Sequence, residues 1–133
     1  MKRPQIMFYS NMKLRLQSHK IAILINSQNP KLDMVLLYMA CKDEKEAKKI
    51  SIHLLKKRLI ACANIFPIKS MYWWNCKVAN ENETAIIAKT SDKNFKKAAN
   101  EAKRIHSYRI PCIMRISAAA NKEYEAWAKK EMA

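Results

Sequence analysis

The residues best suited to chemistry are one histidine, two cysteines and a methionine, placed by pattern at strand ends or in the loop before a strand. They are His106, Cys62, Cys41 and Met39. Imidazole, thiolate and thioether donors together suit soft or borderline cations such as copper, so these four are the candidate metal ligands. For Cys62 the alternative is a small buried core residue. The three histidines are scattered and give no catalytic triad, so we expect no enzyme.

Four polar residues lie within or beside apolar strands and form a second candidate site: Lys69, Tyr72, Lys89 and Tyr108. A lysine among apolar neighbours must extend to solvent, pair with an acid or bind an anion. The functional hypothesis is a cleft between subunits that receives a small molecule. The alternative is that both lysines pair with Glu81 or Glu83 across that interface.

The aromatic stretch Leu59–Cys76 predicts an assembly surface. Residues 61–66 alternate as in a strand, Pro67 marks an edge or bend, and Asn75-Cys76 suits a tight reversal that demands positive φ. Trp73 and Trp74 near the turn are too much apolar surface for one small subunit to bury. Because adjacent strand residues point to opposite faces, we expect one of them inside its own subunit and the other against a neighbour.

The elements that position these residues follow the order β-α-β-β-α-β-α. Asp43, with Glu46 three residues on, is the N-cap candidate of the first helix, which ends near Arg58. Ser91 or Asp92 caps the second helix and Asn121 the last. Two crossovers on one antiparallel sheet predict an α+β, split β-α-β fold.

Several stretches of this chain resemble the CutA divalent-cation-tolerance family. They are residues 58–70 with Tyr72-Trp73-Trp74, then Lys89-Thr90, His106-Ser107-Tyr108 with Pro111, and Glu123-Tyr124 with Trp127. The resemblance runs from about Met34 to the C-terminus. It implies a ferredoxin-like subunit with an extended central hairpin and a C-terminal helix. It also implies a PII-like homotrimer, with Trp73, Trp74 and Trp127 at the interface.

The resemblance also implies cation ligands at the end of the first strand and just before the tyrosine of a His-x-Tyr motif. His106 matches this pattern. Met39 stands where the family has a cysteine, with Cys41 two residues on, and Ile105 replaces a second histidine. We therefore expect no required cofactor and only weak binding of copper or another divalent cation. The alternative function is a PII-like small-molecule sensor or structural trimer without a physiological metal.

Length and composition limit the remaining possibilities. A chain of 133 residues predicts one domain, 34–133, preceded by a basic extension, 1–33, that is a targeting arm, a dispensable tail or upstream translated sequence. No apolar run approaches a membrane span, so no membrane partner is expected. Four widely spaced cysteines without a secretion signal predict free thiols in the cytoplasm.

The formal net charge of +15 favours weak, non-specific attraction to nucleic acid. The alternative is a set of solvated lysine faces on helices. We expect no specific nucleic-acid partner.

Overall fold

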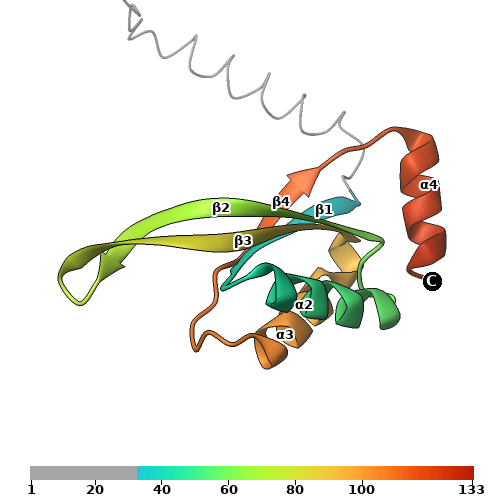
Figure 1. Ribbon diagram of the computed structural model, residues 1–133. Helices are drawn as coiled ribbons and strands as arrows, with labels where there is room; N and C mark the ends of the chain where they lie inside the picture. Colours follow the sequence, from blue (N-terminus) through green and yellow to red (C-terminus); the bar gives the residue numbers. More distant parts are fainter. Residues whose placement is uncertain (1–32) are drawn as a thin grey trace, which may run out of the picture. The chain divides into compact units, whose positions relative to one another are not determined.

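A computed structural model of the chain describes residues 33–133, so the predicted extension lies, apart from Asp33, outside the described residues. The described residues form seven elements in the predicted order (Figure 1). They are β1 (Met34–Cys41), α2 (Glu44–Lys56), β2 (Cys62–Trp74), β3 (Lys77–Ser91), α3 (Asp92–Ile105), β4 (Ile113–Ala118) and α4 (Lys122–Glu131). This arrangement is the α+β, ferredoxin-like fold expected from the sequence.

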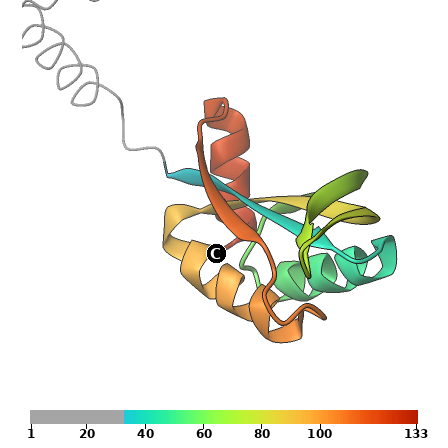
Figure 2. The same ribbon diagram turned by 90° about the vertical axis from the view of Figure 1, so that its left-hand side faces the viewer.

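The four strands form one antiparallel sheet in the order β2-β3-β1-β4. Helices α2 and α3 lie side by side on one face of this sheet (Figure 2). Within residues 33–133 the opposite face has no such pair of helices, and α4 packs near one end of the sheet, where Met34, Ala61 and Ala128 are buried together. The sheet therefore has one helix-covered face and one largely open face.

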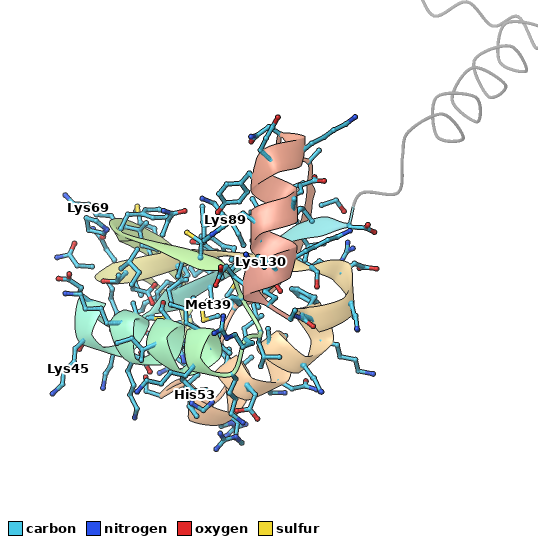
Figure 3. All side chains as sticks on the ribbon, turned by 90° about the vertical axis from the view of Figure 1, so that its right-hand side faces the viewer. Met39, Lys45, His53, Lys69, Lys89 and Lys130 are labelled. Atoms are coloured by element: carbon cyan, nitrogen blue, oxygen red, sulfur yellow. The ribbon has the colours of Figure 1, made fainter. Side chains whose placement is uncertain are left out.

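The core lies between the sheet and the two helices. Alternate β1 residues Leu37, Met39 and Cys41 point to this face and are fully buried. Figure 3 places Met39 between the sheet and α2. Full burial of a side chain such as Leu37 stabilises the fold by about 1.5–3 kcal/mol.

Helix starts agree with the sequence at two positions and differ at the third. Asp43 accepts a hydrogen bond from the Glu46 amide at 2.8 Å, and Ser91 accepts one from the Asn94 amide at 3.1 Å. Asn121 occupies the N-cap position of α4, but its side chain makes no capping bond. Its Nδ2 instead donates to the Glu123 carboxylate at 3.2 Å, so the prediction of an Asn121 side-chain cap was wrong.

Among residues 33–133, three non-glycine residues have positive φ: Arg58 at 58°, Asn75 at 49° and Cys76 at 61°. Arg58 follows Lys57, the C-cap of α2, and the amides of Arg58 and Leu59 bond back to the carbonyls of Leu55 and Leu54. Glycine usually fills such a C-terminal position, but this chain contains none. Each such residue carries a backbone strain of about 1–2 kcal/mol, somewhat less for Asn.

The hairpin of β2 and β3 projects beyond α2 and α3 (Figure 1). Its pairing is continuous from Cys62 opposite Lys89 to Trp74 opposite Lys77. Trp73 is 76% exposed and Trp74 is 66% exposed. The prediction that one tryptophan packs inside its own subunit was therefore wrong, because no helix of the described residues covers either face of the hairpin at this point.

Candidate metal site

Three buried side chains converge where β1 ends. Cys41 is the last residue of β1, Glu46 lies in the first turn of α2, and His106 follows the last turn of α3. One ligand atom from each, Sγ, a carboxylate oxygen and a ring nitrogen, all lie within 4.8 Å of one another. This thiol, carboxylate and imidazole set is a donor combination that Zn²⁺ and Cu²⁺ accept.

Both ring nitrogens of His106 already have hydrogen-bond partners. Nδ1 accepts from the amide of Tyr108 at 3.0 Å, and Nε2 lies 2.9 Å from the carbonyl oxygen of Ala40. An amide can only donate and a carbonyl can only accept, so the proton of the neutral ring is assigned to Nε2. The His106 side chain is fully buried, and its Nδ1 is the nitrogen that faces Glu46, at 3.9 Å from Oε1.

Glu46 connects three segments of the chain. Its Oε2 accepts from the amide of Lys42 at 3.0 Å, and its Oε1 accepts from the amide of Ser107 at 2.7 Å. Burial alone would raise the pKa of Glu46, but hydrogen bonds from Ser107 and Lys42 lower it overall. The site therefore contains a buried carboxylate that is ionised at neutral pH.

Cys41 is a neutral thiol in this setting. Burial, together with the charges of Glu46, Glu83 and Asp43, raises the pKa of Cys41 to about 12. A cation that binds Sγ must therefore displace a tightly held proton. Within residues 33–133, neither Glu46 nor Glu83 forms an ion pair with a lysine or arginine, although the chain carries a net charge of +15.

The structure brings together two of the four predicted metal ligands, Cys41 and His106. Met39 lies two residues before Cys41 on the same face of β1, and both are buried in the hydrophobic core. Cys62 pairs with Lys89 on β3, and Lys89 in turn pairs with Leu36 on β1. Leu36 lies five residues before Cys41, so Cys62 is displaced from Cys41 by about 17 Å along the strand direction. Cys62 therefore lies apart from Cys41 and His106, so the structure does not bring all four predicted ligands together.

Sequence reasoning identified Glu46 as a helix-start residue and missed it as a donor. The signal that was present is its position. In a capping box, the residue three after the N-cap turns its carboxylate back toward the preceding strand end, which here is Cys41.

The predicted cleft residues divide into separate groups. The hydroxyl of Tyr72 donates to Glu81 at 2.9 Å, and the hydroxyl of Tyr108 donates to Glu83 at 2.7 Å. Hydrogen bonding to Glu81 raises the pKa of Tyr72, and burial together with the Glu83 bond raises that of Tyr108. Both phenols are therefore neutral donors.

Lys69 and Lys89 lie apart from each other (Figure 3). Lys69 is exposed opposite Asn82, on the other face of the ribbon from Tyr72. Lys89 has its Nζ 4.0 Å from Cys62 Sγ and 5.4 Å from the centre of the Tyr124 ring. Within the described residues of the single chain neither lysine pairs with an acid, and pairing with Glu81 or Glu83 across a subunit interface stays a prediction.

The open face of the sheet carries exposed apolar residues. Met114 pairs with Tyr38, and Ile116 pairs with Leu36, so all four side chains share that face. Met114 is 47% exposed and Ile116 is 42% exposed. Trp127 of α4 is 44% exposed, with its ring 5.3 Å from that of Tyr124.

These features define a ferredoxin-like protein with an extended β-hairpin and a buried sulfur, nitrogen and oxygen donor cluster at a strand end. Residues 35–131 match the family described as CutA1 divalent ion tolerance protein. The chain therefore belongs to the CutA family.

Relatives and solved structures agree with this assignment. The divalent-cation tolerance protein CutA of Archaeoglobus fulgidus is 41% identical over 92 residues, which are 68% of this chain and 90% of that protein. The protein of the same name from Thermotoga maritima is 35% identical over 100 residues, 74% of this chain and 99% of that protein. The crystal structure of CutA1 from Ehrlichia chaffeensis is 37% identical with a TM-score of 0.74, covering 78% of this chain and 99% of that one.

Within the described residues, no helix combines the length and the apolar character needed to cross a membrane.

Proposed function

We propose that this protein serves divalent-cation tolerance by binding a soft or borderline cation at Cys41, Glu46 and His106, with copper as the first candidate. The observation that carries the proposal is the convergence of three different donor atoms within 4.8 Å. The buried Glu46 carboxylate, which has no lysine or arginine partner among residues 33–133, adds negative charge that favours a cation. The names of the relatives, which specify divalent-cation tolerance, point in the same direction.

The binding is weak in this proposal. A cation must displace the Cys41 proton, whose pKa is raised to about 12, and must compete with existing hydrogen bonds at Glu46 and His106. Each of these lost contacts offsets part of the metal–ligand energy. The site therefore fits a role in buffering or sensing excess cation, with no catalytic residue assigned.

The test is anaerobic titration calorimetry with Cu²⁺, and with Zn²⁺ as a cation without redox chemistry. His106→Ala should lower the affinity at least about tenfold, in line with losses seen when metal-site residues are removed. His53→Ala is the matched control, because His53 contacts Glu101 and lies outside the cluster. Equal heats for wild type and His106→Ala would remove His106 from the site.

The proposed assembly is a homotrimer. The apolar surface for this assembly comes from three places. They are Trp73 and Trp74 at the hairpin tip, Trp127 on α4, and the open sheet face with Met114 and Ile116. Exposed apolar area of this extent is typical of protein interfaces. In a threefold ring, one surface of each copy meets a different surface of the next copy, and closure of the ring leaves no copy unpaired.

The proposed location is the cytoplasm, supported by four free cysteines in the described part of the chain. Other locations occur in relatives: the Archaeoglobus fulgidus structure is named periplasmic and a rice relative chloroplastic. Fractionation of the native host, followed by immunoblotting, distinguishes them.

A further inference from the structure

The decisive atom of the donor cluster is Nδ1 of His106. A neutral imidazole has one proton and one free lone pair on its two nitrogens. With the proton on Nε2 facing the Ala40 carbonyl, the only lone pair is on Nδ1, where the Tyr108 amide donates across 3.0 Å. A cation and the Tyr108 amide therefore cannot both bind the lone pair of Nδ1.

The same short segment also occupies the carboxylate donor. The amide of Ser107, one residue before Tyr108, donates to Oε1 of Glu46 at 2.7 Å. Oε1 is also the carboxylate oxygen nearest to Nδ1, at 3.9 Å. The consecutive amides of Ser107 and Tyr108 thus occupy Oε1 of Glu46 and Nδ1 of His106, the two donor atoms that face each other.

A third contact fixes this segment to the hairpin. The Tyr108 hydroxyl donates to the buried carboxylate of Glu83 on β3 at 2.7 Å. Residues 106–112, which connect α3 to β4, are therefore tied at one end to the donor cluster and to the hairpin. The ring of Tyr108 also lies 5.0 Å from that of His106, so the phenol and the imidazole pack together.

We infer that residues 106–112 act as a gate that competes with the cation for His106 and Glu46, so that cation binding releases the Tyr108 amide. This inference rests on the proposed function, since it specifies how that same site is regulated. By linkage, whatever weakens the closed gate tightens cation binding, and the cation loosens the gate by the same free energy. Cation occupancy is thereby transmitted to the hairpin through the Tyr108–Glu83 contact.

The first measurement is amide hydrogen exchange of the full chain with and without saturating Zn²⁺. We expect the Tyr108 amide to exchange about tenfold or more faster with zinc, while amides in the middle of α2 are unchanged. In His106→Ala the Tyr108 amide should exchange rapidly without zinc. If calorimetry shows that zinc binds, but zinc leaves the protection of the Tyr108 amide unchanged or increases it, the gate is contradicted. The metal site itself is then still supported.

The second measurement uses Tyr108→Phe, which keeps the amide and the ring but removes the hydroxyl bound to Glu83. We expect zinc to bind about 3- to 10-fold more tightly, because one tether of the closed gate is lost. The matched control is Tyr72→Phe, which removes the similar bond to Glu81 and should leave the zinc affinity unchanged. Unchanged or weaker binding in Tyr108→Phe contradicts the gate, and absence of zinc heat in the wild type contradicts the metal site itself.

Discussion

Lys89 lies directly opposite Cys62 in the β2–β3 register, and its Nζ approaches Sγ to 4.0 Å. The ammonium group also stands 5.4 Å from the Tyr124 ring centre, so Cys62 belongs to a contact between the sheet and α4. Cys41, by contrast, lies at the far end of β1 beside Glu46 and His106. Cys41 and Cys62 were both candidate metal ligands in the sequence, but the fold gives them different surroundings.

The first prediction uses this difference between the two cysteines. Cys41→Ala should weaken zinc or copper binding at least about tenfold, because it removes the sulfur donor from the cluster. Cys62→Ala should bind as the wild type does, because Cys62 is about 17 Å along the strand from Cys41. Calorimetry measures the metal affinity of both variants. A loss of affinity in Cys62→Ala alone would place the metal outside the cluster of Cys41, Glu46 and His106.

The fold was predictable because each helix and strand is indicated by a local sequence pattern. Alternating or continuous apolar runs fixed the strands, apolar stripes fixed α2 and α3, and Asp43 and Ser91 marked two helix starts. The site was only partly predictable, because it depends on register. Whether Cys62 or Cys41 approaches His106 is decided by which residues pair across the sheet, and a single chain gives no direct signal for that pairing.

The two tryptophans show a further limit of sequence reasoning. Alternation correctly placed Trp73 and Trp74 on opposite faces of the ribbon, but it carries no information about how far α2 extends under the hairpin. Both side chains are exposed, because the helices end before the tip is reached (Figure 1).

The second prediction concerns the hairpin turn. Cys76 has a φ of 61°, a region in which a side chain with a Cβ atom is strained. Cys76→Gly should raise the free energy of unfolding by about 1 kcal/mol per subunit, offset in part by the greater freedom of glycine when unfolded. Thermal melts should shift upward by a few degrees. Asn75→Gly is the control and should gain less, because asparagine tolerates this region; a lower melting temperature for Cys76→Gly would contradict the strain.

The third prediction concerns acid sensitivity. The Glu101 carboxylate contacts Arg104 at 2.9 Å, His53 at 2.7 Å and Lys57 at 3.4 Å. Its hydrogen bonds with Arg104, and then with His53, lower the pKa of Glu101 to about 2, against an ordinary value of 4.5. Because the folded-state pKa is depressed, this stabilisation is fully present above about pH 4.5 and is lost as the pH falls toward 2.

Glu101→Gln tests this expectation by urea unfolding at several pH values. The stability difference between wild type and variant should be largest near neutral pH and should shrink between pH 4.5 and pH 2. Glu44→Gln, which removes an exposed pair with Lys48, controls for the loss of one surface acid. A difference between wild type and Glu101→Gln that does not change with pH would rule out the carboxylate as its source.

The last prediction concerns assembly through the hairpin tip. Trp73 and Trp74 are 76% and 66% exposed, so their replacement by alanine removes no core contact of the single chain. The double variant should keep its circular dichroism spectrum, whereas light scattering coupled to size exclusion should show a fall from about three chain masses to one, 15.5 kDa. Each tryptophan buries on the order of 150–250 Å² when covered, and at about 25 cal/mol per Å² this is an upper bound of several kcal/mol per side chain. Ile52→Ala on α2, whose side chain is 51% exposed on the helix-covered side of the sheet, is the matched control and should leave the mass unchanged. A double-alanine variant that remains a trimer of unchanged thermal stability would move the interface away from the hairpin, to the open sheet face of Met114 and Ile116.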